Sequence, residues 1–425
     1  MRKWLLPGLA NPLLIVRDPV AILVWWLALR TGRWRRDLWT ISLLFIGVAS
    51  FLLTLALGIG PVTALFGLRA VCLHFPLVFI FARVLNREDV LRLGTFFLAL
   101  ALPMAVLMVL QFQAGSEAII SKGVGAELGG QLSGGEGRIR PPGVFSFTIS
   151  IPHYYSLCLA FLLHRFATEE RRATLRLIVP SLGVALATAV AISRALVASL
   201  ILVGVVFVLS AIRMGVPFRK YAALLLTGAI LAGFWTYSNI AREGASAYDN
   251  RWQEAGDTTG TFLGRALDMF SVGGDAYAQA GIVGKGLGLG TNVGARLATG
   301  ERDFLLAESE WPRIVLEMGV VLGTAFIAWR VALVLKLGKI AVAAWTRQDM
   351  LPALLFSAAA IPLLTGQTGV PAVLGYAVIS AGIAFAAGQP PQGEPLGAQA
   401  RRREMRAPPS RAGVWPPRRP TRPRI

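Results

Sequence analysis

Apolar residues in this chain fall into blocks of about 18 to 25 positions, the length of helix that crosses the ~30 Å hydrocarbon layer of a membrane. Short charged clusters separate the blocks. A first block, 4–29, is interrupted by prolines and by Arg17-Asp18, and is either one distorted helix or a re-entrant piece followed by a helix. Ten clearer blocks follow, at 38–58, 61–82, 90–112, 148–167, 176–193, 195–212, 221–240, 310–334, 350–365 and 368–387. The pattern predicts an all-α polytopic membrane protein with about eleven transmembrane helices, within a range of 10 to 12.

The distribution of Lys and Arg predicts the orientation of these helices. With the spans above, six basic clusters fall on one side of the membrane, around 30–36, 83–92, 165–176, 213–220, 336–347 and 401–406. Basic loops mark the cytoplasmic side, so the C-terminus is expected there. The same alternation places two long loops, 113–147 and 241–309, on the outer side, and the first is rich in glycine.

Composition agrees with a membrane protein. Hydrophobic residues make up 55% of the 425 positions and charged residues only 15%, against roughly 25% in soluble domains. The net charge of +19 is dispersed among loops and tail, which excludes the continuous basic stripe of a nucleic-acid-binding protein. We therefore predict one transmembrane domain, 1–387, and a disordered Pro/Arg-rich cytoplasmic tail, 388–425, that can touch anionic lipid. The basic, apolar N-terminus resembles a signal peptide without a cleavage site and is expected to be retained.

Several arginines lie on the predicted outer side, where the positive-inside rule does not require them. An arginine near a membrane is costly and usually marks a substrate path or a paired group, and its planar fork binds phosphate oxygens in pairs. Such a set suits a diphosphate. The alternative is that each arginine reaches lipid headgroups or pairs with a loop carboxylate. The candidates are Arg138, Arg140, Arg194, Arg265 and Arg313.

Carboxylates cluster at the predicted outer end of the helix that begins near 310. Glu308 and Glu310 are candidate catalytic residues, because a partly buried carboxylate there could act as a general base. Capping of the helix by acidic residues is the alternative. Glu317 lies four residues after Arg313, so an ion pair between them is expected on one helix face. His153, at the outer end of its span, is a possible contributor to the site.

A glycine run from Gly284 to Gly290 lacks the Gly-Lys-Ser/Thr ending of a P-loop, and no strand-then-helix context accompanies it. We expect a flexible turn there. No metal-ligand cluster and no cofactor motif are evident in the sequence.

These motifs together resemble the bacterial O-antigen ligase and polysaccharide polymerase superfamily, over roughly residues 15 to 385. The matching pieces, in order, are Arg138 and Arg140 with Gly143-Val144-Phe145, Ser193-Arg194-Ala195, Gly264-Arg265, the glycine run 284–290, and Glu317-Met318-Gly319 with Gly323. Members of that family transfer polyprenyl-diphosphate-linked glycans at the outer face of the bacterial inner membrane. The resemblance implies that Arg194 and Arg265 hold the diphosphate and that polar residues near 310 activate the acceptor hydroxyl.

Ligases of this family typically carry a His-Asn pair where this chain has Glu308-Ser309. That difference favours a polymerase of lipid-linked oligosaccharide repeat units over a ligase that moves a finished glycan to a lipid or protein. Other polysaccharide assembly proteins are possible partners. A transporter of a lipid-linked sugar is an alternative of another class, although no internal repeat of broken helices is evident.

Overall fold

The computed structural model of the protein is helical almost throughout the residues that it describes, which are 16–34, 37–115, 118–121, 133–135, 138–168, 175–217, 274–300, 306–307 and 309–389. The α-helices are α2 (Arg17–Arg30), α3 (Leu38–Ala56), α4 (Pro61–Leu68), α5 (Leu77–Val84), α6 (Arg87–Ala114), α7 (Ile151–Thr168), α9 (Ile178–Val190), α10 (Arg194–Arg213), α14 (Gly274–Ala280), α15 (Asn292–Thr299), α16 (Glu310–Thr346), α17 (Leu351–Leu364) and α18 (Pro371–Gly388). A π-helical turn, η2 (Arg69–His74), joins α4 to the segment before α5, and three 3₁₀ turns are η3 (Ile119–Ser121), η4 (Thr148–Ser150) and η5 (Leu175–Leu177). Strands β1 (Ser133–Gly135) and β2 (Arg138–Ile139) form a small antiparallel hairpin.

Six helical segments of the described chain are long and apolar enough to cross a membrane. They are Leu38–Ala56, Pro61–Val84, Arg87–Ala114, Arg194–Arg213, Glu310–Thr346 and Pro371–Gly388, and two shorter apolar helices are Ile178–Val190 and Leu351–Leu364. The prediction of an all-helical membrane protein is confirmed at this level. The predicted span 148–167 is the helix α7, which is not among the six, and the predicted span 221–240 lies outside the described residues.

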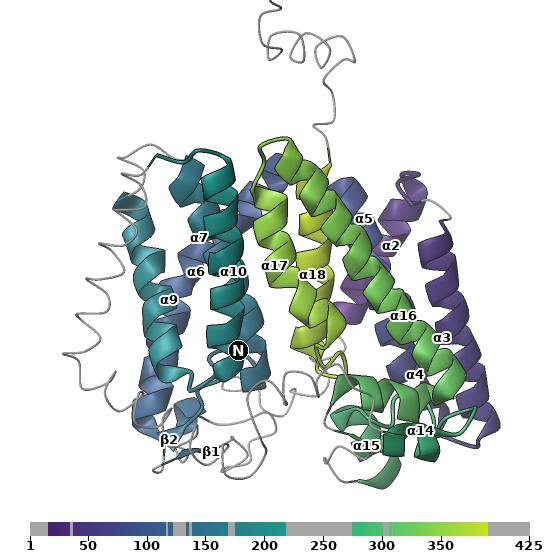
Figure 1. Ribbon diagram of the computed structural model, residues 1–425. Coiled ribbons are helices and arrows are strands. Elements are labelled where there is room, and N and C mark those ends of the chain that lie inside the picture. The colour runs from purple at the N-terminus through teal and green to yellow at the C-terminus, as the bar shows by residue number, and fades with distance from the viewer. Residues whose placement is uncertain are drawn as a thin grey trace, which may run out of the picture. The chain divides into compact units, whose positions relative to one another are not determined.

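The helices of the described core form two groups joined by a central pair (Figure 1). Helices α6, α7, α9 and α10 pack together in one group. Helices α2 to α5 and α16 lie in the other, with α14 and α15 beside the start of α16. The central pair consists of α17, which contacts α7, α10 and α16, and α18, which contacts α5.

Local capping explains where several of these helices begin. The Asp37 carboxylate accepts a hydrogen bond from the backbone N–H of Thr40 at 2.8 Å, as an N-cap residue does. Burial alone would raise the pKa of Asp37, but hydrogen bonds from Thr40 and from Arg83, at 2.6 Å, hold it below its ordinary value. Asn86 forms a capping box at the start of α6.

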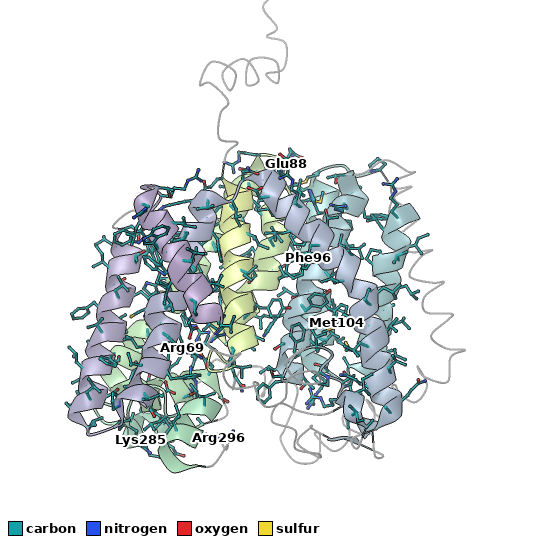
Figure 2. All side chains as sticks on the ribbon, turned by 180° about the vertical axis from the view of Figure 1, so that it is seen from behind. Arg69, Glu88, Phe96, Met104, Lys285 and Arg296 are labelled. Atoms are coloured by element: carbon teal, nitrogen blue, oxygen red, sulfur yellow. The ribbon has the colours of Figure 1, made fainter. Side chains whose placement is uncertain are left out.

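The loop before α6 and the loop before α17 meet at one end of the described helices. Arg87 at the start of α6 pairs with Asp349, which precedes α17. Figure 2 shows Glu88 at this end, whereas Lys285 and Arg296 lie at the opposite end. These two loops, which are far apart in the sequence, therefore lie at the same end of the described helices.

The helix predicted over 310–334 differs from the prediction in two ways. It continues past Lys336 to Thr346. The ammonium group of Lys336 lies 4.6 Å from the ring centroid of Trp39, and this aromatic face stabilises the charge within the helix. It is also interrupted at Gly319, whose φ of 80° and ψ of 170° are not helical. This interruption shapes the candidate site.

Candidate functional site

Gly319 reverses the direction of the start of α16. A positive φ of this kind favours glycine, and a Cβ atom on Gly319 would lie only 2.1 Å from the carbonyl oxygen of Ile282. Beyond the break, Gly323 lies directly against the backbone of Val315, where a Cβ would approach the Val315 Cα to 2.8 Å. The segment from Glu310 to Met318 is therefore folded back against the helix that follows it.

The glycine run forms backbone hydrogen bonds to α16 at this break. The backbone N–H groups of Lys285 and Gly286 donate to the carbonyl oxygens of Leu316 and Glu317, at 2.7 and 3.1 Å. These carbonyl groups lose their usual helical partners at the break, so the loop satisfies them. The sequence predicts a flexible turn here, whereas the structure gives this segment backbone hydrogen bonds to α16.

Close packing explains why the run is made of glycines. Gly284 has a φ of +83°, and a Cβ there would lie 2.3 Å from the nitrogen of Gly319. At Gly290 a Cβ would lie 2.5 Å from Cγ of Arg313. The Gly290 N–H also donates to Oε1 of Glu317 at 2.7 Å. Two motifs that are about thirty residues apart in the sequence thus pack directly against each other.

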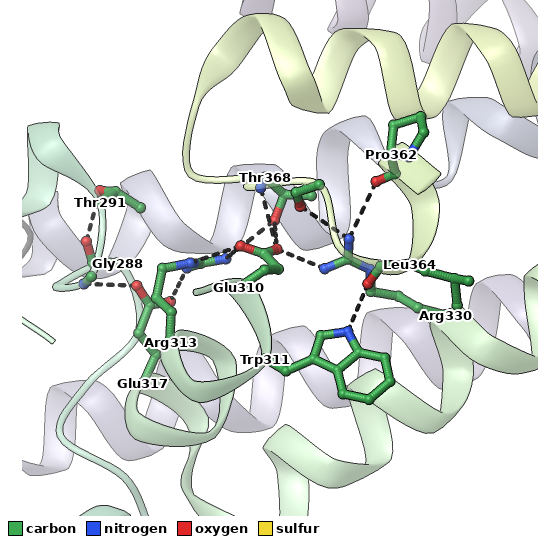
Figure 3. A network of polar contacts seen from close by, with 12 residues as sticks. Gly288, Thr291, Glu310, Trp311, Arg313, Glu317, Arg330, Pro362, Leu364 and Thr368 are labelled. Carbon is green, nitrogen blue, oxygen red and sulfur yellow. Dashed lines mark hydrogen bonds and ion pairs between the residues drawn. The ribbon is translucent and has the colours of Figure 1, made fainter. Parts of the chain in front are cut away.

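The reversal brings five polar residues into one buried group, which we call the Glu310 network: Glu310, Arg313, Glu317, Arg330 and Thr368 (Figure 3). Arg313 pairs with Glu310 and with Glu317, each at 2.9 Å. The second pair confirms the ion pair predicted from the sequence. Glu310 also accepts from Arg330 at 2.6 Å and from the Thr368 hydroxyl at 2.6 Å. Both Glu310 oxygens are thus engaged.

Arg330 is fully buried, with none of its side chain exposed. Besides Glu310, it donates to the carbonyl oxygens of Leu363, Gly366 and Pro362, at 2.6, 3.1 and 3.4 Å. These carbonyl groups belong to the end of α17 and the turn after it, where helical partners are missing. Arg330 therefore ties that turn, and with it Thr368, to Glu310.

A second polar group, the Asp18 cluster, consists of Arg17, Asp18, Arg69 and His74. Asp18 pairs with Arg69 at 2.6 Å, and its other oxygen lies 3.3 Å from His74 and 3.6 Å from Arg17. Arg17 also donates to the carbonyl oxygen of Pro371 at 2.9 Å. The cluster connects the start of α2 with η2 and the start of α18.

A pocket lies between the Asp18 cluster and the Glu310 network. Its polar lining consists of Arg17, Arg69, Thr291, Arg313, Glu317 and Thr368. Phe66, Phe75, Leu287 and Phe326 are among its apolar lining residues. Figure 2 shows Arg69 between the two ends of the helices, on the side toward Lys285. Three guanidinium groups next to aromatic walls suit an anion attached to an apolar chain.

The structure brings together only some of the predicted site residues. Arg313 lines the pocket and Glu310 pairs with it. His153 is buried beside Tyr376, with ring centroids 6.4 Å apart, and does not line the pocket. Arg140 and Arg194 are partly buried elsewhere and do not line it either. Glu308 and Arg265 lie outside the described residues, as does the side chain of Arg138.

Sequence reasoning missed Arg69, His74 and Arg330 as members of these groups and did not assign Arg17-Asp18 to a site. The available signal was the same for most of them: a charged residue inside an apolar block, which is costly unless it is paired. In the described residues, no three His, Cys, Asp or Glu side chains come close enough to hold a metal ion.

Comparison with known proteins adds no assignment. No family model matches the chain, and no curated protein matches it. The chemistry of the pocket is therefore the basis for assigning a function.

Proposed function

We propose that this protein transfers a polyprenyl-diphosphate-linked glycan onto an acceptor sugar at the outer face of the bacterial inner membrane. In this proposal the chain spans the membrane about eleven times, and the end that carries the basic loops and the C-terminus faces the cytoplasm. The reaction is polymerisation of O-antigen or exopolysaccharide repeat units. Ligation of the finished glycan to a lipid or protein is the alternative within the same class.

The observation that supports the proposal is the pocket lined by Arg17, Arg69 and Arg313. Together with Arg330 and the carboxylates that pair with them, Asp18, Glu310 and Glu317, the described groups hold one positive charge in excess, so an anion is electrostatically favoured. The apolar walls suit the adjoining isoprenoid units, since buried apolar surface contributes about 25 cal/mol per Å². A lipid diphosphate offers both features in one molecule.

In the proposed reaction, a hydroxyl oxygen of the acceptor sugar forms a bond to the anomeric carbon of the donor. The bond from that carbon to the diphosphate oxygen breaks, and its electron pair leaves with the diphosphate. Arginines that already contact the diphosphate stabilise the charge that develops there. The hydroxyl proton passes to a base, for which Glu308 stays the predicted residue. Arg265 likewise stays a predicted diphosphate ligand, whereas Arg194 does not line this pocket and has no role in the proposed binding of the diphosphate there.

Glu310 has a different proposed role. Both of its oxygens accept hydrogen bonds from Arg313, Arg330 or Thr368, and its side chain is 1% exposed. A carboxylate held by two arginines is a weak proton acceptor. We therefore assign Glu310 to positioning Arg313 and Thr368 at the pocket, instead of to the general-base role predicted from the sequence.

A transporter is the second candidate, because interrupted helices such as α16 occur at transporter substrate sites. In transporters, the freed backbone groups bind the substrate or ion. Here the carbonyl groups of Leu316 and Glu317 already accept hydrogen bonds from Lys285 and Gly286. The break therefore helps to form the wall of the pocket. This favours an enzyme that acts at the membrane surface over a transporter.

Gene deletion followed by gel analysis of surface polysaccharide tests the proposal. Single repeat units retained on the carrier lipid are the expected result and identify a polymerase. Long chains that are not attached to an acceptor would identify a ligase. Unchanged surface glycans would refute both activities. Restoring the wild-type gene, but not an Arg69→Ala variant expressed at the same level, is expected to restore the normal pattern.

A further inference from the structure

His74 lies directly behind the pocket, on the turn η2 that also carries Arg69. Its Nδ1 is 2.9 Å from the carbonyl oxygen of Arg69, and its Nε2 is 3.3 Å from Oδ1 of Asp18. One neighbour is a backbone carbonyl oxygen and the other belongs to the carboxylate that pairs with Arg69 at 2.6 Å, so both accept hydrogen bonds. The His74 side chain is 10% exposed, so water does not readily replace either partner.

A neutral imidazole cannot satisfy both oxygens. It carries one N–H, so one ring nitrogen donates and the other presents a lone pair. With the proton on Nδ1, that nitrogen donates to the Arg69 carbonyl oxygen. The lone pair of Nε2 then faces the Asp18 carboxylate, and both Nε2 and Oδ1 are buried without a hydrogen-bond partner among the described residues. A doubly protonated imidazolium would satisfy both neighbours.

Charges around the cluster oppose that extra proton while the pocket is empty. Among the residues that the structure describes, Arg17 and Arg69 are the cations of this cluster and Asp18 is its anion. Helices α3 and α4 bring no charged side chain to η2. The charged residue of α5 is Arg83, which pairs with Asp37.

Two further titratable groups lie on the described elements that pack around His74. Cys72, on η2 itself, has its Sγ 3.9 Å from the carbonyl oxygen of Leu44. Tyr376 is the titratable residue that α18 contributes, and its ring contacts Phe145 and His153 instead. Neither group supplies a charge that favours a protonated imidazole.

The charge balance changes when an anion enters. In the described residues of the Asp18 cluster and the Glu310 network, four guanidinium groups face three carboxylates. One positive charge is therefore in excess. A diphosphate diester carries two negative charges and would leave the site with one negative charge in excess. One proton restores neutrality, and buried sites strongly disfavour an uncompensated charge.

We propose that His74 is a proton-binding site coupled to the pocket, and that it takes up one proton when a diphosphate diester binds. This inference rests on the proposed function, because it requires the pocket to take such an anion. The imidazolium then donates from Nδ1 to the Arg69 carbonyl and from Nε2 to Asp18. His74 acts through Arg69 and Asp18 and is therefore a positioning residue.

Linkage fixes the sign of the pH dependence. Since the bound state holds one proton more than the free state, binding must strengthen as pH falls. The dissociation constant is expected to increase by up to about tenfold for each unit by which the pH is raised. This holds in the pH range where His74 is protonated in the bound protein and neutral in the free protein. The effect is confined to the pH range between the pKa values of His74 in the free and in the bound protein, which titrations at several pH values locate.

Calorimetric titration of the full-length protein in lipid nanodiscs tests the inference, with geranyl-diphosphate-linked glucose as the probe. This probe is a diphosphate diester, so its own charge does not change in the range studied. Titrations in two buffers of different ionisation enthalpy count the protons taken up. We expect about one proton per bound probe for the wild type, with a pH-dependent dissociation constant.

Variants assign the proton to His74. The protein has three histidines, which keeps the comparison small. His74→Gln is expected to bind without proton uptake and with a nearly constant dissociation constant, since glutamine can still donate to one of the two oxygens. His153→Gln, whose histidine contacts Tyr376 away from the pocket, is expected to behave like the wild type.

The outcomes separate this inference from the proposed function. Binding of the probe with no proton uptake by the wild type overturns the proton site and leaves the diphosphate pocket in place. Proton uptake that persists in His74→Gln also overturns the assignment. Absence of binding at every pH overturns both. The number of protons taken up by the wild type is measured without any variant. The inference can therefore be refuted even if a variant folds poorly.

Discussion

Replacing Glu310 by glutamine removes the carboxylate that neutralises Arg330. Arg330 has no exposed side-chain surface, and Glu310 is the carboxylate that pairs with it among the described residues. Removal of one member of a buried ion pair leaves an uncompensated charge and typically costs about 3 to 5 kcal/mol. Three carbonyl oxygens continue to accept from Arg330. We therefore expect Glu310→Gln to lower the free energy of unfolding by about 3 kcal/mol, at the lower end of that range.

The geometry also predicts the order of related variants. Glu317→Gln leaves Arg313 paired with Glu310 at 2.9 Å, so it removes a charge-assisted contact without stranding a charge. Its expected cost is about 1.5 kcal/mol. Arg330→Met likewise leaves Glu310 paired with Arg313, and it should cost less than Glu310→Gln. The double variant Glu310→Gln/Arg330→Met contains no stranded charge and should be more stable than Glu310→Gln alone.

Unfolding of the purified full-length variants by dodecyl sulfate in mixed micelles, followed by far-ultraviolet circular dichroism, measures this order. The comparison between the double variant and Glu310→Gln is decisive, because each carries the same change at position 310. If Glu310→Gln is as stable as the wild type, or if the double variant is no more stable than the single one, then the buried pair with Arg330 does not exist as described.

Two further predictions concern the pocket and its wall. Arg17→Ala removes one charge-assisted contact of about 1.5 to 3 kcal/mol and should weaken binding of geranyl-diphosphate-linked glucose roughly tenfold to a hundredfold; Arg296→Ala, which changes an exposed arginine of α15, should leave the dissociation constant unchanged. Gly284→Ala should destabilise the protein by at least about 1 kcal/mol, since φ is +83° and the new Cβ would meet the backbone of Gly319 at 2.3 Å. Gly274→Ala has open space around its Cβ and should cost little in the same unfolding measurement.

Sequence reasoning reached the helical membrane class because runs of apolar residues are a direct consequence of the bilayer's thickness. It also found the pair between Arg313 and Glu317, because a spacing of four residues places two side chains on one helix face. It could not find the partnership of Arg69 with Asp18, which are 51 residues apart. A charge inside an apolar block indicates that a partner exists, but the partner's identity depends on how helices pack.

The break at Gly319 explains why the pair between Glu310 and Arg330 could not be predicted from the sequence. Glu310 and Arg330 are separated by twenty residues of the same helix, a distance of about 30 Å if the helix were straight. Their side chains nevertheless meet at 2.6 Å. The contact requires the chain to reverse at Gly319, the small residue Gly323 to let the returning segment approach, and the loop 281–290 to satisfy the freed carbonyl groups. The same reversal turns Arg313 and Glu317 toward the pocket, opposite Arg17 and Arg69. The short glycine motifs thus allow the backbone to adopt the conformation that brings the charged residues together. The chemistry of the site depends on these glycines as much as on its arginines.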